Sequence, residues 1–203
     1  MANVFTQASL QVGTGMQDYG GLNGVLVGNR IPKDYFVTEG TGQSDITVHA
    51  GSYHLALRNA GIEMCNIMCY SSILPKIARQ IDKPAELTHG SVMETISAVA
   101  TADRGQRATA GIIYGWLRRK DDGEKHGGLV CEYNGHKAEA DACAELRSSL
   151  KELYTNGYSD DFDMDEIVLH STSFVPEKRY GTALIALCFV NYVVPMLGNT
   201  QGL

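Results

Sequence analysis

The sequence lacks the features that mark membrane, nucleic-acid-binding and metal-binding proteins. No apolar run approaches the ~20 residues that a membrane span needs, and the N-terminal stretch has no basic region followed by an apolar block, so we expect no secretory signal. The net charge is −6 and the densest basic cluster is RRK at 118–120, which argues against nucleic acid as a partner. The five cysteines include no CxxC pair, so we expect reduced thiols in a cytoplasmic protein and no metal site.

The length of 203 residues suits a single domain with a sizeable core. The first 30 residues are rich in glycine and asparagine, and their glycine spacing does not fit the nucleotide-binding pattern G-x-G-x-x-G. We therefore expect residues 1–30 to form a loop-rich arm and residues 31–203 to form the domain.

Apolar periodicity, with glycine and proline as stops, indicates several strands and two helices. The clearest helix covers 136–158, and a shorter one covers 50–61 with Gly61 just past its end. The strand over 34–40 is expected to end in a glycine turn, and the strand over 63–71 is expected to be buried. Strands are predicted over 34–40, 63–71, 91–101 (where a helix also fits), 108–119, 127–135, 165–174 and 182–191. This order predicts the α+β class, as a layered sandwich.

The adjacent serines Ser71 and Ser72 allow two interpretations. A serine pair at the end of a strand is usually a turn or a capped loop. Alternatively, the Ser72 hydroxyl can attack the carbonyl of Ser71 across a strained peptide bond and form an ester. β-Elimination of that ester leaves dehydroalanine at position 72, and hydrolysis then releases ammonia and leaves a pyruvoyl group. Composition alone does not decide between the two.

The stretch NAGIEMCNIMCYSSILP, residues 59–75, resembles the signature of pyruvoyl-dependent arginine decarboxylases, which cleave between two serines. A second stretch, GLVCEYNG at 128–135, resembles another segment of that family, and the resemblance covers roughly residues 30–195. It implies a four-layer αββα sandwich that is cleaved into a β chain, 1–71, and an α chain, 72–203. It also implies a homo-oligomer, a trimer of two-chain units, with active sites at the subunit interfaces.

The resemblance also implies roles for individual residues. Ser72 is the precursor of the pyruvoyl group, and Ser71 is the residue left at the end of the first chain. Glu132 matches a glutamate that donates a proton, and Asn66 matches an asparagine that helps to form the active site. Without the resemblance, Asn66 is equally open to a structural role as a cross-strand amide. The positions expected to bind substrate are His54, Leu57, Glu63, Cys65 and Ile73.

The implied reaction converts L-arginine to agmatine and CO₂ without a metal or pyridoxal phosphate. The keto group at position 72 forms a Schiff base with the substrate and accepts the electron pair as CO₂ leaves, a role that pyridoxal phosphate has in other enzymes. A proton must then return to the α-carbon, and a carboxyl group on a buried strand holds its proton more readily. Strand alternation places Glu132 on the same face as Val130, which favours a buried position over an exposed one.

His54 departs from the family pattern, which has an aspartate that contacts the guanidinium of arginine. Histidine lacks the carboxylate fork that a guanidinium favours, and protonated histidine would repel it. Either Asp45 or Glu63 supplies a carboxylate, or the substrate is another amino acid, or His54 is structural in a rearranged pocket. Arginine remains the expected substrate, and an uncleaved, inactive scaffold or binding protein is the rival from another class. A serine hydrolase would need a motif such as G-x-S-x-G, which is absent from the sequence.

Overall fold

A computed structural model describes residues 17–18, 23–24 and 29–194 of the chain. Residues 31–193 form one compact unit. Most of the predicted arm lies outside the described residues, so the arm stays a prediction. Its described part consists of residues 29–30 and an antiparallel pair of two-residue strands, β1 (Gln17–Asp18) and β2 (Asn23–Gly24). No helix in the described part of the chain is long and apolar enough to cross a membrane.

Two larger sheets make up most of the compact unit. The five-stranded sheet has the order β5-β8-β12-β4-β7, and its long central strand β12 runs antiparallel to both β8 and β4. Its strands are β5 (Asn66–Cys69), β8 (Val92–Asp103), β12 (Tyr180–Phe189), β4 (Asp34–Ser44) and β7 (Arg79–Gln80). The four-stranded sheet has the order β11-β9-β10-β6 and is antiparallel. Its strands are β11 (Phe162–Phe174), β9 (Ala108–Arg119), β10 (Lys125–Gly135) and β6 (Ile73–Pro75). A separate pair joins β3 (Ile31–Pro32) to β13 (Tyr192–Val193).

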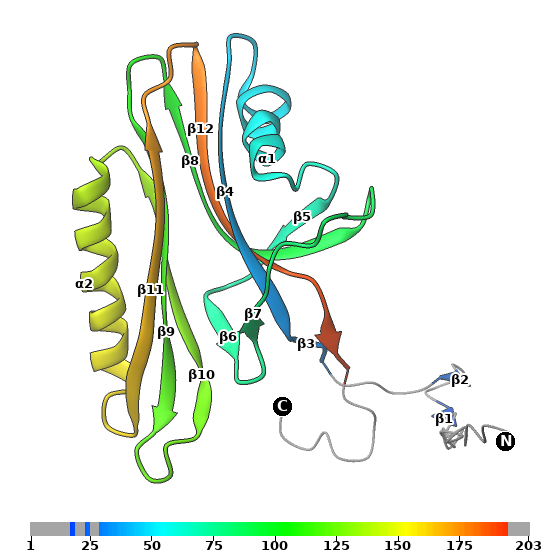
Figure 1. The fold of residues 1–203 in the computed structure, drawn as a ribbon, viewed down its shortest axis with the longest axis vertical. Coiled ribbons are helices and arrows are strands. Elements are labelled where there is room, and N and C mark those ends of the chain that lie inside the picture. The colour runs from blue at the N-terminus through cyan, green and yellow to red at the C-terminus, as the bar shows by residue number, and fades with distance from the viewer. Residues whose placement is uncertain (1–16, 19–22, 25–28, 195–203) are drawn as a thin grey trace, which may run out of the picture. The chain divides into compact units, whose positions relative to one another are not determined.

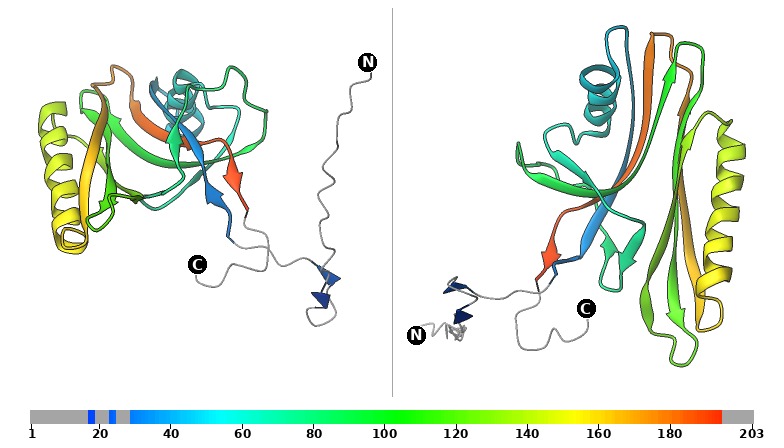
Figure 2. Two further views of the ribbon diagram at one scale, coloured as in Figure 1. Left: turned by 60° about the horizontal axis from the view of Figure 1, so that its bottom comes forward. Right: turned by 180° about the vertical axis from the view of Figure 1, so that it is seen from behind.

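Each larger sheet carries a helix on its outer face, and the inner faces of the two sheets pack together (Figure 1). Helix α1 (His54–Ala60), which follows the π-helical turn η1 (Val48–Tyr53), lies against the five-stranded sheet. Helix α2 (Glu139–Gly157) lies against the four-stranded sheet, and Figure 2 shows the same order of layers from behind. The fold is therefore mixed α+β, mostly sheet, and compatible with the expected sandwich.

Three clusters of buried side chains hold these layers together. The cluster between the sheets includes Tyr35 from β4 and Ile112 from β9. The cluster under α1 includes Leu57, and the cluster under α2 includes Leu146 and Leu150. Fully burying each of these aliphatic side chains contributes about 1.5–3 kcal/mol, so the two helices are fixed mainly by their apolar faces.

Most predicted elements are confirmed. Helix α2 lies within the predicted range 136–158. Helix α1 ends at Ala60 and is followed by Gly61, whose φ of 67° is left-handed, as expected for a residue just past the end of a helix. The strands predicted over 91–101, 108–119, 127–135, 165–174 and 182–191 correspond to β8, β9, β10, β11 and β12.

The glycine turn predicted after residue 40 is wrong, because β4 continues without interruption to Ser44. A Cβ atom at Gly40 would lie 2.1 Å from the carbonyl oxygen of Ala56, and one at Gly42 would lie 2.2 Å from that of Ser52. Glycine is therefore required here because η1 and α1 lie directly on the strand, and not because the chain turns.

The buried strand predicted over 63–71 is only partly correct. Strand β5 covers the four residues Asn66–Cys69, and it is largely exposed, with Met68 52% accessible. The reason is its place at the edge of the five-stranded sheet, where Ile67 is the strand residue that packs against the cluster under α1.

Asp34 anchors the start of β4 to neighbouring segments. Its side chain is almost fully buried and accepts hydrogen bonds from Arg79 Nε at 2.7 Å, Asn191 Nδ2 at 2.7 Å and Lys33 Nζ at 3.0 Å. The hydrogen bond from Arg79, followed by those from Asn191 and Lys33, holds the pKa of this carboxyl well below its usual range. Asp34 is therefore charged in the folded protein at all but very acidic pH.

Candidate active site

The Ser71–Ser72 peptide bond lies where the chain passes from one sheet to the other. Strand β5 belongs to the five-stranded sheet and β6 to the four-stranded sheet, and Ser72 forms a bend between them. On one side, the N–H of Tyr70 donates to the carbonyl oxygen of Thr95 in β8 at 2.7 Å. On the other side, the carbonyl oxygen of Ser72 accepts from the N–H of Val130 in β10 at 3.0 Å. The serine pair is therefore held between two anchors, one in each sheet.

The structure brings Ser72 and Glu132 together, although they are 60 positions apart. The Ser72 hydroxyl donates to Glu132 Oε1 at 2.7 Å and lies 2.9 Å from Oε2, within hydrogen-bond distance of both. Val130, two positions before Glu132, is buried in the cluster between the sheets, and both Ser72 and Glu132 are half-buried. A carboxylate that accepts a hydroxyl proton in this way can take up that proton when the oxygen acts as a nucleophile.

The neighbouring thiol of Cys131 lies on the other face of β10 and packs against the cluster under α2. Burial, and to a smaller extent the charge of Glu132, raises the pKa of Cys131. The Ser72 hydroxyl, and not this thiol, is hydrogen-bonded to Glu132.

Asn66 lies at the start of β5, in a different set of contacts. Its Nδ2 donates to the carbonyl oxygen of Gly90 at 2.8 Å, and its main-chain N–H donates to that of Ser91 at 2.8 Å. Within the described residues, these hydrogen bonds join Asn66 to the turn before β8 and not to Ser72 or Glu132. In one copy of the chain, Asn66 has the geometry of the structural amide.

His54 and Leu57 line a hollow of about 440 Å³ on the surface of η1 and α1, together with His49, Ala50 and Tyr53. The rings of His49 and Tyr53 are stacked, with centroids 5.8 Å apart and planes 25° apart. Sequence reasoning missed His49, Ala50 and Tyr53. His49 lies just before the predicted helix 50–61, so nothing in the sequence indicated its stacking on Tyr53.

None of the described residues that line this hollow is acidic. Asp45 instead accepts hydrogen bonds from Arg104 Nη2 at 3.3 Å and from the N–H of Arg179 at 3.1 Å. Glu63 is half-buried in the loop after α1 and does not line the hollow either. A carboxylate from the same chain next to His54 is therefore not supported.

The last two expected substrate positions differ from each other. Cys65 is buried under α1, with its Sγ 3.4 Å from Ser91 Oγ, so it packs as a small apolar side chain. Ile73, next to Ser72, is 56% exposed.

In the described part of the chain, no group of three or more His, Cys, Asp and Glu side chains could hold a metal ion.

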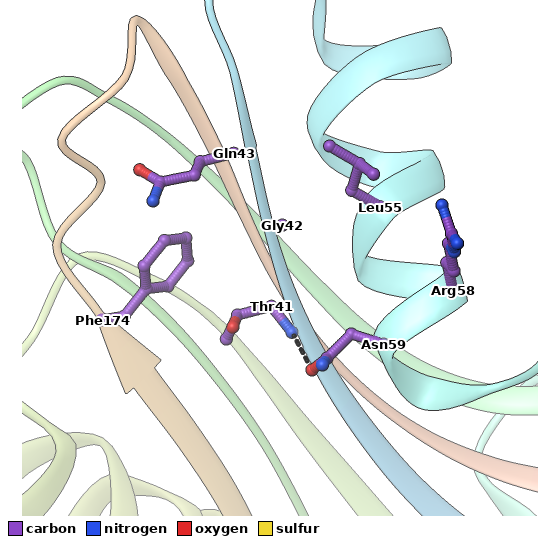
Figure 3. A pocket seen from close by; sticks show the side chains of 7 residues that line it. All are labelled: Thr41, Gly42, Gln43, Leu55, Arg58, Asn59 and Phe174. Carbon is purple, nitrogen blue, oxygen red and sulfur yellow. Dashed lines mark hydrogen bonds between the residues drawn. The ribbon is translucent and has the colours of Figure 1, made fainter.

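A second hollow lies between β4, α1 and the end of β11 (Figure 3). Asn59 Oδ1 accepts a hydrogen bond there from the N–H of Thr41 at 3.1 Å, which ties α1 to the free edge of β4. The lining residues are Thr41, Gly42, Gln43, Leu55, Arg58, Asn59 and Phe174. They include no residue of the serine–glutamate pair.

Comparisons with known proteins identify the family of this chain. Residues 34–194 match the family model for pyruvoyl-dependent arginine decarboxylase. The chain is 31% identical over 192 residues to the pyruvoyl-dependent arginine decarboxylase AaxB of Chlamydia abortus, covering 81% of this chain and 94% of that protein. The AaxB protein of Chlamydia pneumoniae gives the same identity and coverage. A pyruvoyl-dependent arginine decarboxylase of Methanopyrus kandleri is 40% identical over 70 residues, or 34% of this chain and 45% of that protein. The chain belongs to the pyruvoyl-dependent arginine decarboxylase family.

Proposed function

We propose that this protein is a self-processing, pyruvoyl-dependent decarboxylase that converts L-arginine to agmatine and CO₂. The observation that carries the proposal is the hydrogen bond from the Ser72 hydroxyl to Glu132 at 2.7 Å, at the serine pair where the family cleaves its chain. The relatives that match 81% of this chain are named for arginine, which supports arginine as the substrate.

Self-processing begins with Ser72. Its hydroxyl proton passes to Glu132 as the oxygen attacks the carbonyl carbon of Ser71. Glu132 then returns this proton to the nitrogen as the C–N bond breaks, so that an ester and a free amine on residue 72 result. Loss of the α-proton of residue 72 then breaks its Cβ–Oγ bond and releases the Ser71 carboxylate. Water adds at the α-carbon and ammonia leaves, so that chains 1–71 and 72–203 result.

The surroundings of Ser72 fit a pyruvoyl group. A group formed at position 72 remains attached to the residue whose carbonyl oxygen is bound by Val130 N–H, and it faces Glu132. The group supplies a carbonyl that accepts the electron pair released when CO₂ leaves. Glu132 no longer has a serine hydroxyl to bind, so its carboxyl group is free to hold a proton and return it to the substrate α-carbon.

The separation of the expected site residues supports an assembly of several copies of the chain. Ser72 and Glu132 belong with the four-stranded sheet, whereas the hollow at His54 and Leu57 lies on the helix that covers the other sheet. We propose that the hollow of one copy faces the serine–glutamate pair of another, which would complete the site in the trimer that the family resemblance implies.

Two observations bear on the substrate. The stacked rings of His49 and Tyr53 offer a flat surface on which the guanidinium of arginine can stack. The lack of an acidic residue among the described residues lining the hollow favours the second candidate, a decarboxylase of a less basic amino acid.

All five cysteines are free thiols, which supports the expected cytoplasmic location.

A denaturing gel and a CO₂-release assay test the proposal. Wild-type protein should give two fragments and release CO₂ from arginine in preference to lysine, ornithine and histidine. Ser72→Ala should give one band and no activity, whereas the matched variant Ser71→Ala keeps the attacked carbonyl and should still be cleaved. A single intact wild-type chain would refute self-processing, and CO₂ release from another amino acid but not from arginine would refute the substrate.

A further inference from the structure

We propose that a pocket between the two larger sheets binds a small carboxylate that carries a flat apolar group. The pocket lies where β7 pairs with the start of β4, and its volume is about 230 Å³. Sites for drug-sized ligands have roughly 300–1,000 Å³, so this pocket suits a smaller molecule. Neither Ser72 nor Glu132 lines it, and the site is therefore separate from the serine–glutamate pair.

Three aromatic rings form one wall of the pocket. They belong to Tyr35 of β4 and to Tyr114 and Trp116 of β9, and none of the three residues is more than 5% exposed. The rings of Tyr35 and Tyr114 meet edge to face with centroids 6.2 Å apart, and those of Tyr114 and Trp116 do so at 6.5 Å. Because the rings hold one another in place, the wall is already formed, and a flat apolar group can pack against it.

Lys125 brings a positive charge to this wall. Its Nζ lies 3.1 Å from the centroid of the Trp116 ring and donates to the carbonyl oxygen of Ala78 at 3.0 Å. Within the described residues these are its two contacts, and neither partner is a carboxylate. Burial lowers the pKa of Lys125, because its charge is removed from water. A bound carboxylate can accept a hydrogen bond from this ammonium group and compensate its charge.

Two residues of the short strand β7 add further donors. Arg79 Nε donates to Asp34 at 2.7 Å, while the terminal nitrogens of its guanidinium have no hydrogen-bond partner among the described residues. Gln80 Oε1 accepts from the Tyr114 hydroxyl at 2.9 Å, which leaves the NH₂ group of the same amide as a donor. Guanidinium groups favour the oxygens of carboxylates and phosphates. The donors around the pocket therefore favour an anion.

The one carboxylate that lines the pocket, Glu166, is already paired. Its Oε1 accepts from Arg118 Nη2 at 2.7 Å, so its charge is balanced and does not exclude an anion. Glu166 has a φ of 49°, the one positive value for a non-glycine residue in the described part of the chain. It lies in a bulge of β11 where the register shifts between Asp165 and Val168. Strained residues and bulges are concentrated at functional sites, which is a second, independent sign of a binding site here.

Tryptophan fluorescence tests the proposal, because Trp116 is the single tryptophan of the chain and lines the pocket. Purified protein is titrated with benzoate, with benzamide as its uncharged analogue, and with inorganic phosphate as an anion without a flat group. Benzoate should change the emission in a saturable way. It should bind about tenfold or more tightly than benzamide, as expected for a hydrogen bond to a charged group, and more tightly than phosphate.

A variant with a matched control tests the role of the ammonium group. Lys125→Met keeps a long side chain without the charge and should weaken benzoate binding about tenfold or more. Lys76→Met makes the same substitution at an exposed lysine that pairs with Glu124 outside the pocket, and it should bind benzoate like the wild type. Calorimetric titration gives the dissociation constants of both variants without relying on the emission of Trp116.

Several outcomes would overturn the proposal. They are no saturable response of the wild type to benzoate, equal binding of benzamide and benzoate, and equal benzoate binding by Lys125→Met and the wild type. Phosphate binding as tight as benzoate binding would overturn the assignment of a flat apolar group. The comparison of ligands on the wild type stays decisive even if Lys125→Met does not fold. None of these results bears on chain cleavage or CO₂ release, so they are separate from the proposed function.

Discussion

Glu132→Gln is expected to slow self-cleavage strongly, because it removes the base while keeping the shape of the side chain. The Ser72 hydroxyl donates to Glu132 Oε1 at 2.7 Å, and a glutamine amide oxygen can accept that hydrogen bond but cannot take up the proton. A positioned general base contributes about 10²–10⁴-fold to a rate. At about 1.4 kcal/mol for each tenfold change, this raises the barrier by about 3–5 kcal/mol.

The assay is a time course of fragment formation after cell-free synthesis of the full chain. Glu124→Gln is the matched control, because it makes the same substitution at an exposed glutamate paired with Lys76, and it should be cleaved at the wild-type rate. Cleavage of a folded Glu132→Gln variant at the wild-type rate would contradict the assignment of Glu132 as the base. Slow cleavage with unchanged folding, measured by circular dichroism, would agree with it.

Three further predictions concern the fold. The depressed pKa of Asp34 stabilises the protein above the unfolded value of about 4 and loses this effect as the pH falls, so Asp34→Asn should be less stable at pH 7 by a margin that shrinks in acid. A difference in the free energy of unfolding between the wild type and the variant that stays the same at every pH, measured by urea denaturation, would contradict this. Gly42→Ala should lower the midpoint of thermal unfolding, since its Cβ would lie 2.2 Å from the Ser52 carbonyl oxygen and such overpacking costs about 1–3 kcal/mol or more, and an unchanged midpoint would count against the close contact. After cleavage the two chains should co-elute in native chromatography, because β4 of one pairs with β12 of the other along almost its whole length; separate elution would refute this.

The sequence predicted correctly those helices and strands whose buried residues recur at one regular spacing. Helix α2 buries Ala142, Leu146 and Leu150, which repeat at helical spacing, and this stripe was visible in the sequence. Gly40 and Gly42 misled the prediction, because a glycine that permits close packing looks the same in a sequence as a glycine that turns the chain. Only the position of α1 over β4 distinguishes the two cases.

In the candidate site, too, the sequence predicted some features and missed others. Strand alternation predicted a buried Glu132 on the side of Val130, and the structure leaves it half-buried with its carboxylate 2.7 Å from the Ser72 hydroxyl. The ring pair of His49 and Tyr53 was missed because the π-helical turn that carries it has no simple sequence pattern.

The most direct test of self-processing is the intact mass of purified wild-type protein under denaturing conditions. Two chains are expected, one ending at Ser71 and one beginning at position 72, and the second should be lighter by one ammonia than a chain that begins with serine. A single mass for the whole polypeptide, with an unmodified serine at position 72, would contradict the account.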